Sequence, residues 1–157
     1  MRFTLIKNLA QDGLMKSILN GLLAFIALYI ISSAFVKYFG FGLFPSEIYI
    51  TLFGNEEQFI DAITTSTLLE YWHSEIFFTM MVLLTLSTIF IRTNKNSSIY
   101  IHTVMITAII SIISLPLAYF ISKSFVNIYS FSTILYYVVA LIMILKSLWK
   151  LNFAKNL

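Results

Sequence analysis

The sequence contains no cysteine, and charged residues make up only 11% of its 157 positions. The lack of cysteine excludes disulfides, thiolate metal sites and thiol redox chemistry. The charged fraction is less than half of the roughly 25% that is usual in soluble globular domains, whereas hydrophobic residues make up 59%. The composition therefore predicts a protein embedded in a membrane.

Signatures of catalysis are also missing. The sequence has no phosphate-binding glycine loop, no nucleophile and base at a recognisable spacing, and no detectable inverted repeat. These absences argue against nucleotide-driven, hydrolytic and secondary-transport activities. We therefore rank an enzyme below the non-enzymatic functions and expect no nucleic-acid partner.

Positive charge is missing from the interval between Lys37 and Arg92, although six of the seven acidic residues lie inside it. Those six are Glu47, Glu56, Glu57, Asp61, Glu70 and Glu75. Lysine and arginine gather in the cytoplasmic loops of membrane proteins, so this distribution predicts that both termini and the turn at Arg92 and Lys95 are cytoplasmic. Residues 38–71 would then form a long acidic loop outside a bacterial inner membrane.

Uncharged runs divide the sequence into membrane crossings. Those at residues 17–36, 96–122 and 124–145 each provide at least the roughly 20 residues that a helix needs to cross a hydrocarbon core of about 30 Å. A shorter run at residues 76–91 must also recruit positions near Trp72 to span it. We predict an all-α integral membrane protein, a single domain over residues 1–157, in which four transmembrane helices form a bundle. The crossings are expected at about residues 17–37, 72–92, 98–122 and 125–146.

Helical signals also occur outside the crossings. Residues 3–16 alternate apolar and polar side chains at helical spacing, which predicts an N-terminal helix lying in the membrane interface, with Gly13 as the bend before the first crossing. The alternative is one continuous helix that extends from the first crossing into the cytoplasm. In the loop, Pro45 can open a short apolar helix that Gly54 ends. Capping-box spacing occurs at two places there, at Asn55 with Gln58 and at Thr67 with Glu70. The long external loop is therefore predicted to contain short helices.

One candidate metal-binding pair lies at the start of the predicted second crossing. Glu70 and His73 are one helical turn apart, the spacing found in carboxylate-bridged metal sites. A metal centre in a bundle needs a second such pair, which the sequence lacks, and Glu70 also suits the positive end of a helix. A haem between His73 and His102 is excluded within one chain, because the two would lie about a membrane thickness apart. No cofactor is predicted, metal and haem are disfavoured, and membrane lipid is expected to bind.

Glu75 is the carboxylate that lies deepest in the predicted membrane. Such a group is costly there unless it is paired or faces water, which makes it a functional candidate. Lys37 and Lys123, at the outer ends of the first and third crossings, are its expected partners. We favour a structural ion cluster that joins the outer ends of three helices over a role in transport.

Small hydroxyl residues mark one face of the predicted third crossing. Thr103, Thr107, Ser111 and Ser114 recur at steps of four, four and three. Such a face is typical of close helix packing, with hydroxyls bonding to carbonyls of the preceding turn. The alternative is a polar track that lines a pore, and we favour packing.

Two classes of function remain, with a third ranked below them. The first is an accessory or scaffolding subunit of an oligomeric membrane complex, built with copies of itself or with other membrane proteins. The second is a subunit of a cation- or proton-conducting pore, with Glu75 and His73 as an outer site and His102 as the inner exit. A redox subunit that holds a metal or haem is the third.

Overall fold

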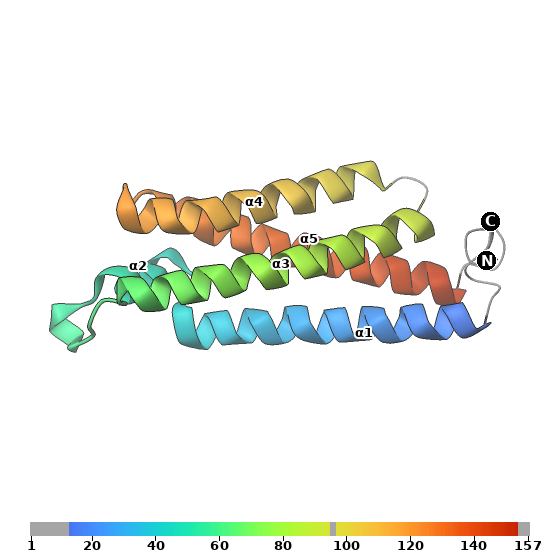
Figure 1. Ribbon diagram of the computed structural model, residues 1–157, viewed down its shortest axis with the longest axis horizontal. Coiled ribbons are helices and arrows are strands. Elements are labelled where there is room, and N and C mark those ends of the chain that lie inside the picture. Colours follow the sequence, from blue (N-terminus) through green and yellow to red (C-terminus); the bar gives the residue numbers. More distant parts are fainter. Residues whose placement is uncertain (1–12, 95–96, 154–157) are drawn as a thin grey trace.

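The computed structural model describes residues 13–94 and 97–153. In these residues four helices are long and apolar enough to cross a membrane. They are α1 (Gly13–Val36) with its π-helical extension η1 (Lys37–Phe41), α3 (Thr65–Thr93), α4 (Ser98–Phe120) and α5 (Phe125–Phe153). Successive long helices run antiparallel, so α1 begins and α5 ends at the same end of the bundle (Figure 1). The predicted helical bundle with four potential crossings is confirmed.

Helix α5 is the central element of the bundle, because it packs against each of the other three long helices. Helices α1 and α3 both pack on α5 and contact each other more sparsely. The fully buried core side chains include Leu23 of α1, Leu86 of α3 and Met143 of α5. This arrangement leaves the surface between α1 and α3 less tightly closed than the α4–α5 interface.

The segment between α1 and α3 contains the short helices that the sequence predicts. Helix α2 (Pro45–Phe53) opens with a proline, and the Glu47 carboxylate accepts hydrogen bonds from the backbone N–H groups of Leu43 (3.0 Å) and Phe44 (3.2 Å). Gly54, with φ of 78°, ends the helix. A short 3-10 helix, η2 (Glu56–Gln58), follows and is capped by the Asn55 side chain. We call this end of the bundle the loop end, and the opposite end the terminal end.

Helix α3 begins earlier than its predicted crossing. It starts at Thr65, three residues before the start that a cap at Thr67 predicts, and the Thr64 hydroxyl accepts the capping hydrogen bond from the N–H of Thr67 (3.3 Å). Thr67 therefore lies inside the helix, and the prediction that it caps the helix is wrong. The extra turns form because Leu68 is buried in the apolar cluster at the loop end. A search for uncharged runs cannot detect this tertiary contact.

The other boundaries also differ from the sequence expectation. Helix α5 continues to Phe153, beyond the predicted end near residue 146, and α4 ends at Phe120 instead of near residue 122. The predicted interfacial helix at residues 3–16 lies largely outside the described residues. Its last part, residues 13–16, forms the first turn of α1 and continues directly into the long helix.

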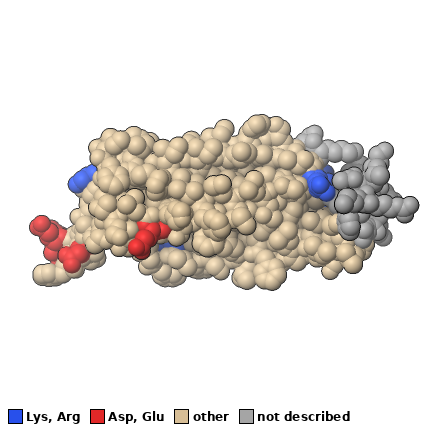
Figure 2. Space-filling model, viewed as in Figure 1, with Lys and Arg blue, Asp and Glu red and all other residues tan. Residues whose placement is uncertain are grey.

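Charged side chains are concentrated at the two ends of the molecule. Figure 2 shows acidic side chains at the loop end, basic side chains at both ends, and a wide uncharged band between them. Such a band is the surface that a lipid hydrocarbon core requires.

Candidate functional site

The site is built around a π-helical turn at the end of α1. In η1 the backbone widens, and the N–H of Gly42 bonds to the carbonyl of Lys37 (2.7 Å). Gly42 has φ of 95°, and a Cβ at this position would lie 2.6 Å from the Cβ of Glu47. Only glycine fits this turn without strain. Lys37, the first residue of this turn, lies seven residues after the buried Ile30 on the inward face of α1, and 6% of its surface is exposed.

Lys37 forms a buried ion pair with Glu75 of α3. The Lys37 ammonium also donates to the hydroxyl of Tyr129 on α5 (3.1 Å), and that hydroxyl donates to the second carboxylate oxygen of Glu75 (3.4 Å). Each of the three helices therefore supplies one polar group to a closed cluster. Pairing offsets the cost of placing both charges away from water.

Tyrosine rings surround the Lys37 ammonium. Its nitrogen lies 5.2 Å from the ring centre of Tyr129, 5.7 Å from that of Tyr137 and 6.0 Å from that of Tyr71. At these distances the ring faces attract the cation. The Tyr137 hydroxyl in turn bonds to Ser33 of α1 (2.9 Å). The aromatic groups thus stabilise the charge and join α1 to α5.

A cavity of about 290 Å³ adjoins the ion pair between α1, α3 and α5. Its lining includes Ser33, Lys37, Glu75, Phe78, Tyr136 and Tyr137. The hydroxyl of Tyr136 is buried in it and has no hydrogen-bond partner among the described residues. The arrangement can offer hydrogen-bond donors to a bound molecule, next to apolar and aromatic walls.

A family model described as Aq_1264_TM, a transmembrane helical domain, matches residues 42–156. The chain belongs to this family. No curated protein and no solved structure shows significant similarity to it. Membership of the Aq_1264_TM family and the four long apolar helices make the chain a multi-pass integral membrane protein. The match includes Glu75 and the tyrosines of α5, whereas Lys37 precedes it.

Lys123 does not join the Glu75 cluster of this Aq_1264_TM protein. Its ammonium donates to the Tyr49 hydroxyl (2.8 Å) and lies 4.7 Å from the ring centre of Phe53. Both partners belong to α2, which packs on α5 near this end. The expected pairing of Glu75 is therefore formed by Lys37, and Lys123 instead fastens α2 to the turn before α5.

The residues considered for a metal or haem lie at opposite ends of the bundle. Glu70 and His73 are exposed on α3 at the loop end, and His102 is exposed in the first turns of α4 at the terminal end (Figure 1). In the described parts of the chain, no three histidine or acidic side chains gather closely enough to hold a metal ion. These residues give no geometric support to the redox alternative.

The hydroxyl face of α4 packs against α5. Thr107, Ser111 and Ser114 are buried, while Thr103 lies at the edge of the seam. The Ser111 hydroxyl bonds to that of Thr133 on α5 (2.6 Å), and Thr107 donates to the carbonyl of Thr103 (2.9 Å). Side chains of α5 occupy the space that a polar track along this face would need, which favours the packing interpretation.

Sequence reasoning missed the tyrosines and the cavity. Tyr129 and Tyr136 are seven residues apart, which places them on one face of α5, and Tyr71 lies one turn before Glu75. Tyr137 follows Tyr136 directly and lies about 100° further around the helix. This periodicity could have identified the cluster. Tyrosine near a membrane edge is more often an interfacial anchor, so the pattern acquires its meaning from the charges that it surrounds.

Proposed function

We propose that the protein is an accessory or scaffolding subunit of an oligomeric membrane complex, assembled with copies of itself or with other membrane proteins. The observation that carries this proposal is an exposed aromatic patch where α1 ends. Its members are Phe35, Tyr38, Phe39 and Phe44. Phe39 is 78% exposed, stacks on Phe35 (6.4 Å between ring centres) and meets Tyr38 edge-on (5.0 Å). Preordered aromatic side chains are typical anchors of protein interfaces.

Polar contacts between helices of this chain also support a scaffold. Hydroxyl and amide pairs join helices of the same chain: Thr93 with Ser147 (3.2 Å) and Asn20 with Asn152 (3.0 and 3.1 Å). Between the Thr93–Ser147 contact and the Lys37–Glu75 cluster the described core contains a layer of apolar side chains, in which Leu86 and Met143 are fully buried. An ion path through one chain would have to cross this apolar layer, so we do not extend the proposal to a pore.

Photocrosslinking in native membranes tests the proposal. A photoreactive phenylalanine analogue at Phe39 should yield protein adducts of defined mass, either a dimer of this chain or a complex with a second membrane protein. The matched control is the analogue at Leu145, which is 65% exposed on α5 and outside the patch. Adducts with lipid alone at both positions would identify the patch as a membrane anchor and contradict the proposal.

A further inference from the structure

The cavity beside the ion pair contains a hydrogen-bond donor without an acceptor. Tyr136 is 7% exposed and lines the cavity beside Thr79, and its hydroxyl forms no hydrogen bond of normal geometry in the described chain. Buried polar atoms in folded proteins almost always have a partner, because an unpaired one loses its bond to water without replacement. An acceptor atom on a bound molecule would supply the missing partner.

Lys37 lines the same cavity and has one more N–H donor than it has acceptors in the described chain. An ammonium group has three N–H donors, and in the described chain Glu75 and Tyr129 accept two of them. Since the positive charge is already balanced by Glu75, the site favours an uncharged molecule that carries acceptor oxygens.

Aromatic side chains give the cavity flat walls. The ring centres of Tyr29 and Phe78 lie 5.7 Å apart, and those of Tyr136 and Tyr137 lie 5.4 Å apart. All four residues line the cavity. Aromatic walls suit a planar group, which can stack on them or meet them edge-on. The volume of about 290 Å³ is near the lower limit of about 300 Å³ for small-molecule pockets. A single substituted ring is an occupant of suitable size.

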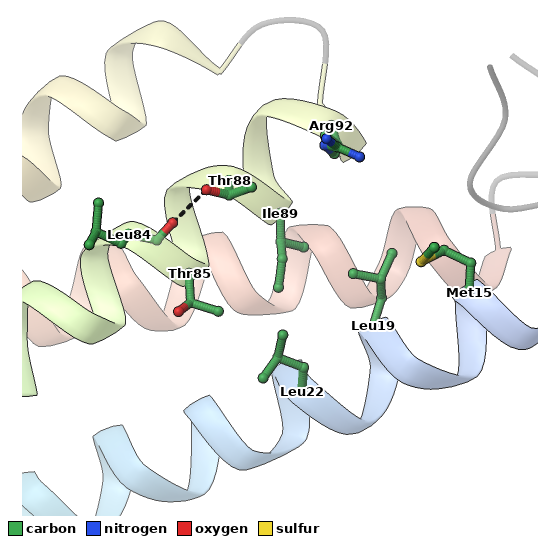
Figure 3. A pocket seen from close by; sticks show the side chains of 8 residues that line it. All are labelled: Met15, Leu19, Leu22, Leu84, Thr85, Thr88, Ile89 and Arg92. Atoms are coloured by element: carbon green, nitrogen blue, oxygen red, sulfur yellow. Dashed lines mark hydrogen bonds between the residues drawn. The ribbon is translucent and has the colours of Figure 1, made fainter. Parts of the chain in front are cut away.

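The cavity continues into an apolar groove along α1 and α3. It shares Tyr29 and Phe78 with a neighbouring hollow of about 220 Å³, and that hollow shares Leu22 and Thr85 with a third of about 380 Å³. Figure 3 shows the third hollow, with Leu22 of α1 opposite Thr85 of α3, near the end of α3 that carries Arg92. We call these two further hollows the α1–α3 groove. The groove exists because α1 and α3 each pack mainly on other elements of the chain.

We propose that this site binds an uncharged membrane lipid with a planar ring, carbonyl oxygens and one long apolar chain, the chemical class of the isoprenoid quinones. The ring occupies the cavity, where a carbonyl oxygen accepts hydrogen bonds from Tyr136 and Lys37. The chain follows the α1–α3 groove toward the terminal end. A phospholipid fits less well, because its charged phosphate has no unbalanced partner beside the ion pair. The inference is independent of the proposed scaffold function.

Binding can be measured with the full chain in phosphatidylcholine nanodiscs. The probe is a benzoquinone with a decyl chain. Its binding is measured by the quenching of tryptophan fluorescence and by the rise in the melting temperature of the protein. Wild type should bind saturably. Tyr136→Phe should weaken binding about three- to tenfold, the value of one lost hydrogen bond, without lowering the melting temperature of the empty protein. The control Tyr119→Phe removes a hydroxyl that bonds to Thr65 outside the cavity, and should bind like wild type.

A second variant tests the place of the chain. Thr85→Phe fills the α1–α3 groove, so it should weaken binding of the decyl probe about tenfold and leave binding of the same ring without a chain unchanged. The control Leu145→Phe introduces a phenylalanine ring on the exposed surface of α5, outside the groove, and should bind both probes like wild type. The proposal is overturned by unsaturable quenching in wild type, by wild-type affinity in Tyr136→Phe, or by a phospholipid that occupies the groove and excludes the probe.

Discussion

At the scale of single residues, Lys37 and Glu75 carry opposite charges inside a bundle whose surface is otherwise made for lipid. Their side chains are 7% and 10% exposed, so water screens the pair little. The tyrosine hydroxyl and ring faces around the pair satisfy further donor and acceptor positions. Such a cluster is stable as a whole and sensitive to the loss of any one charge.

Glu75→Gln should therefore destabilise the protein strongly. The change leaves the buried Lys37 ammonium without its carboxylate, which costs about 3–5 kcal/mol for buried pairs. Thermal unfolding in mild detergent should detect a large fall in melting temperature. Glu56→Gln, in the exposed η2, is the matched control and should melt like wild type. Equal melting of the two variants would mean that Glu75 is hydrated.

The sequence was sufficient to predict a lysine partner for Glu75, because both groups had to lie at the same depth in the membrane. It could not choose between Lys37 and Lys123. That choice depends on how α1 packs on α3 and α5, which turns the face of Lys37 inward, and on α2, whose Tyr49 accepts a hydrogen bond from Lys123. Both causes are tertiary contacts, which form only in the folded chain. The unpaired hydroxyl of Tyr136 is likewise invisible in a sequence, since it depends on which neighbours are absent.

At the scale of elements, the turn from η1 into α2 positions the site. Gly42 adopts a positive φ, and its backbone lies close to that of Ile48. A Cβ added at Gly42 would lie only 2.8 Å from the backbone nitrogen of Ile48. Gly42→Ala should cost about 1–3 kcal/mol in unfolding free energy, because a side chain there is strained and has no space. Gly40→Ala is the control, since nothing lies within 4 Å of an added Cβ at that position. Denaturation in detergent should give a lower free energy of unfolding for Gly42→Ala than for Gly40→Ala. Equal values would show that the backbone of the turn can shift to accept the side chain.

The packing of helix α4 on helix α5 can also be tested by mutation. Ser111→Leu overfills a close contact and removes the partner of the Thr133 hydroxyl, so it should destabilise the bundle by about 1–3 kcal/mol. Thr103→Leu, at the partly exposed edge of the same face, should be tolerated. Melting temperature and assembly state are the measurements. A folded and assembled Ser111→Leu protein that lost a measurable wild-type ion flux would instead support the pore.

At the scale of the whole molecule, the sorting of charges along the sequence predicts the orientation in the membrane. The described fold is compatible with that prediction, since the start of α1, the α3–α4 connection and the end of α5 share the terminal end (Figure 1). On the face that Figure 2 shows, the acidic side chains of the described residues lie toward the loop end. We therefore propose that the terminal end faces the cytoplasm of a bacterial inner membrane.

Cysteine labelling can test this orientation, because the natural chain has no cysteine that would interfere. Glu57→Cys places a thiol in η2 at the loop end, and Ser98→Cys places one in the first turn of α4 at the terminal end. Both parent residues are exposed, so a difference in reactivity reports the side of the membrane and not burial. An impermeant maleimide added to intact cells should label Glu57→Cys alone, and both variants should react once the membrane is permeabilised. Labelling of Ser98→Cys alone in intact cells would reverse the orientation, because the acidic loop would then be cytoplasmic.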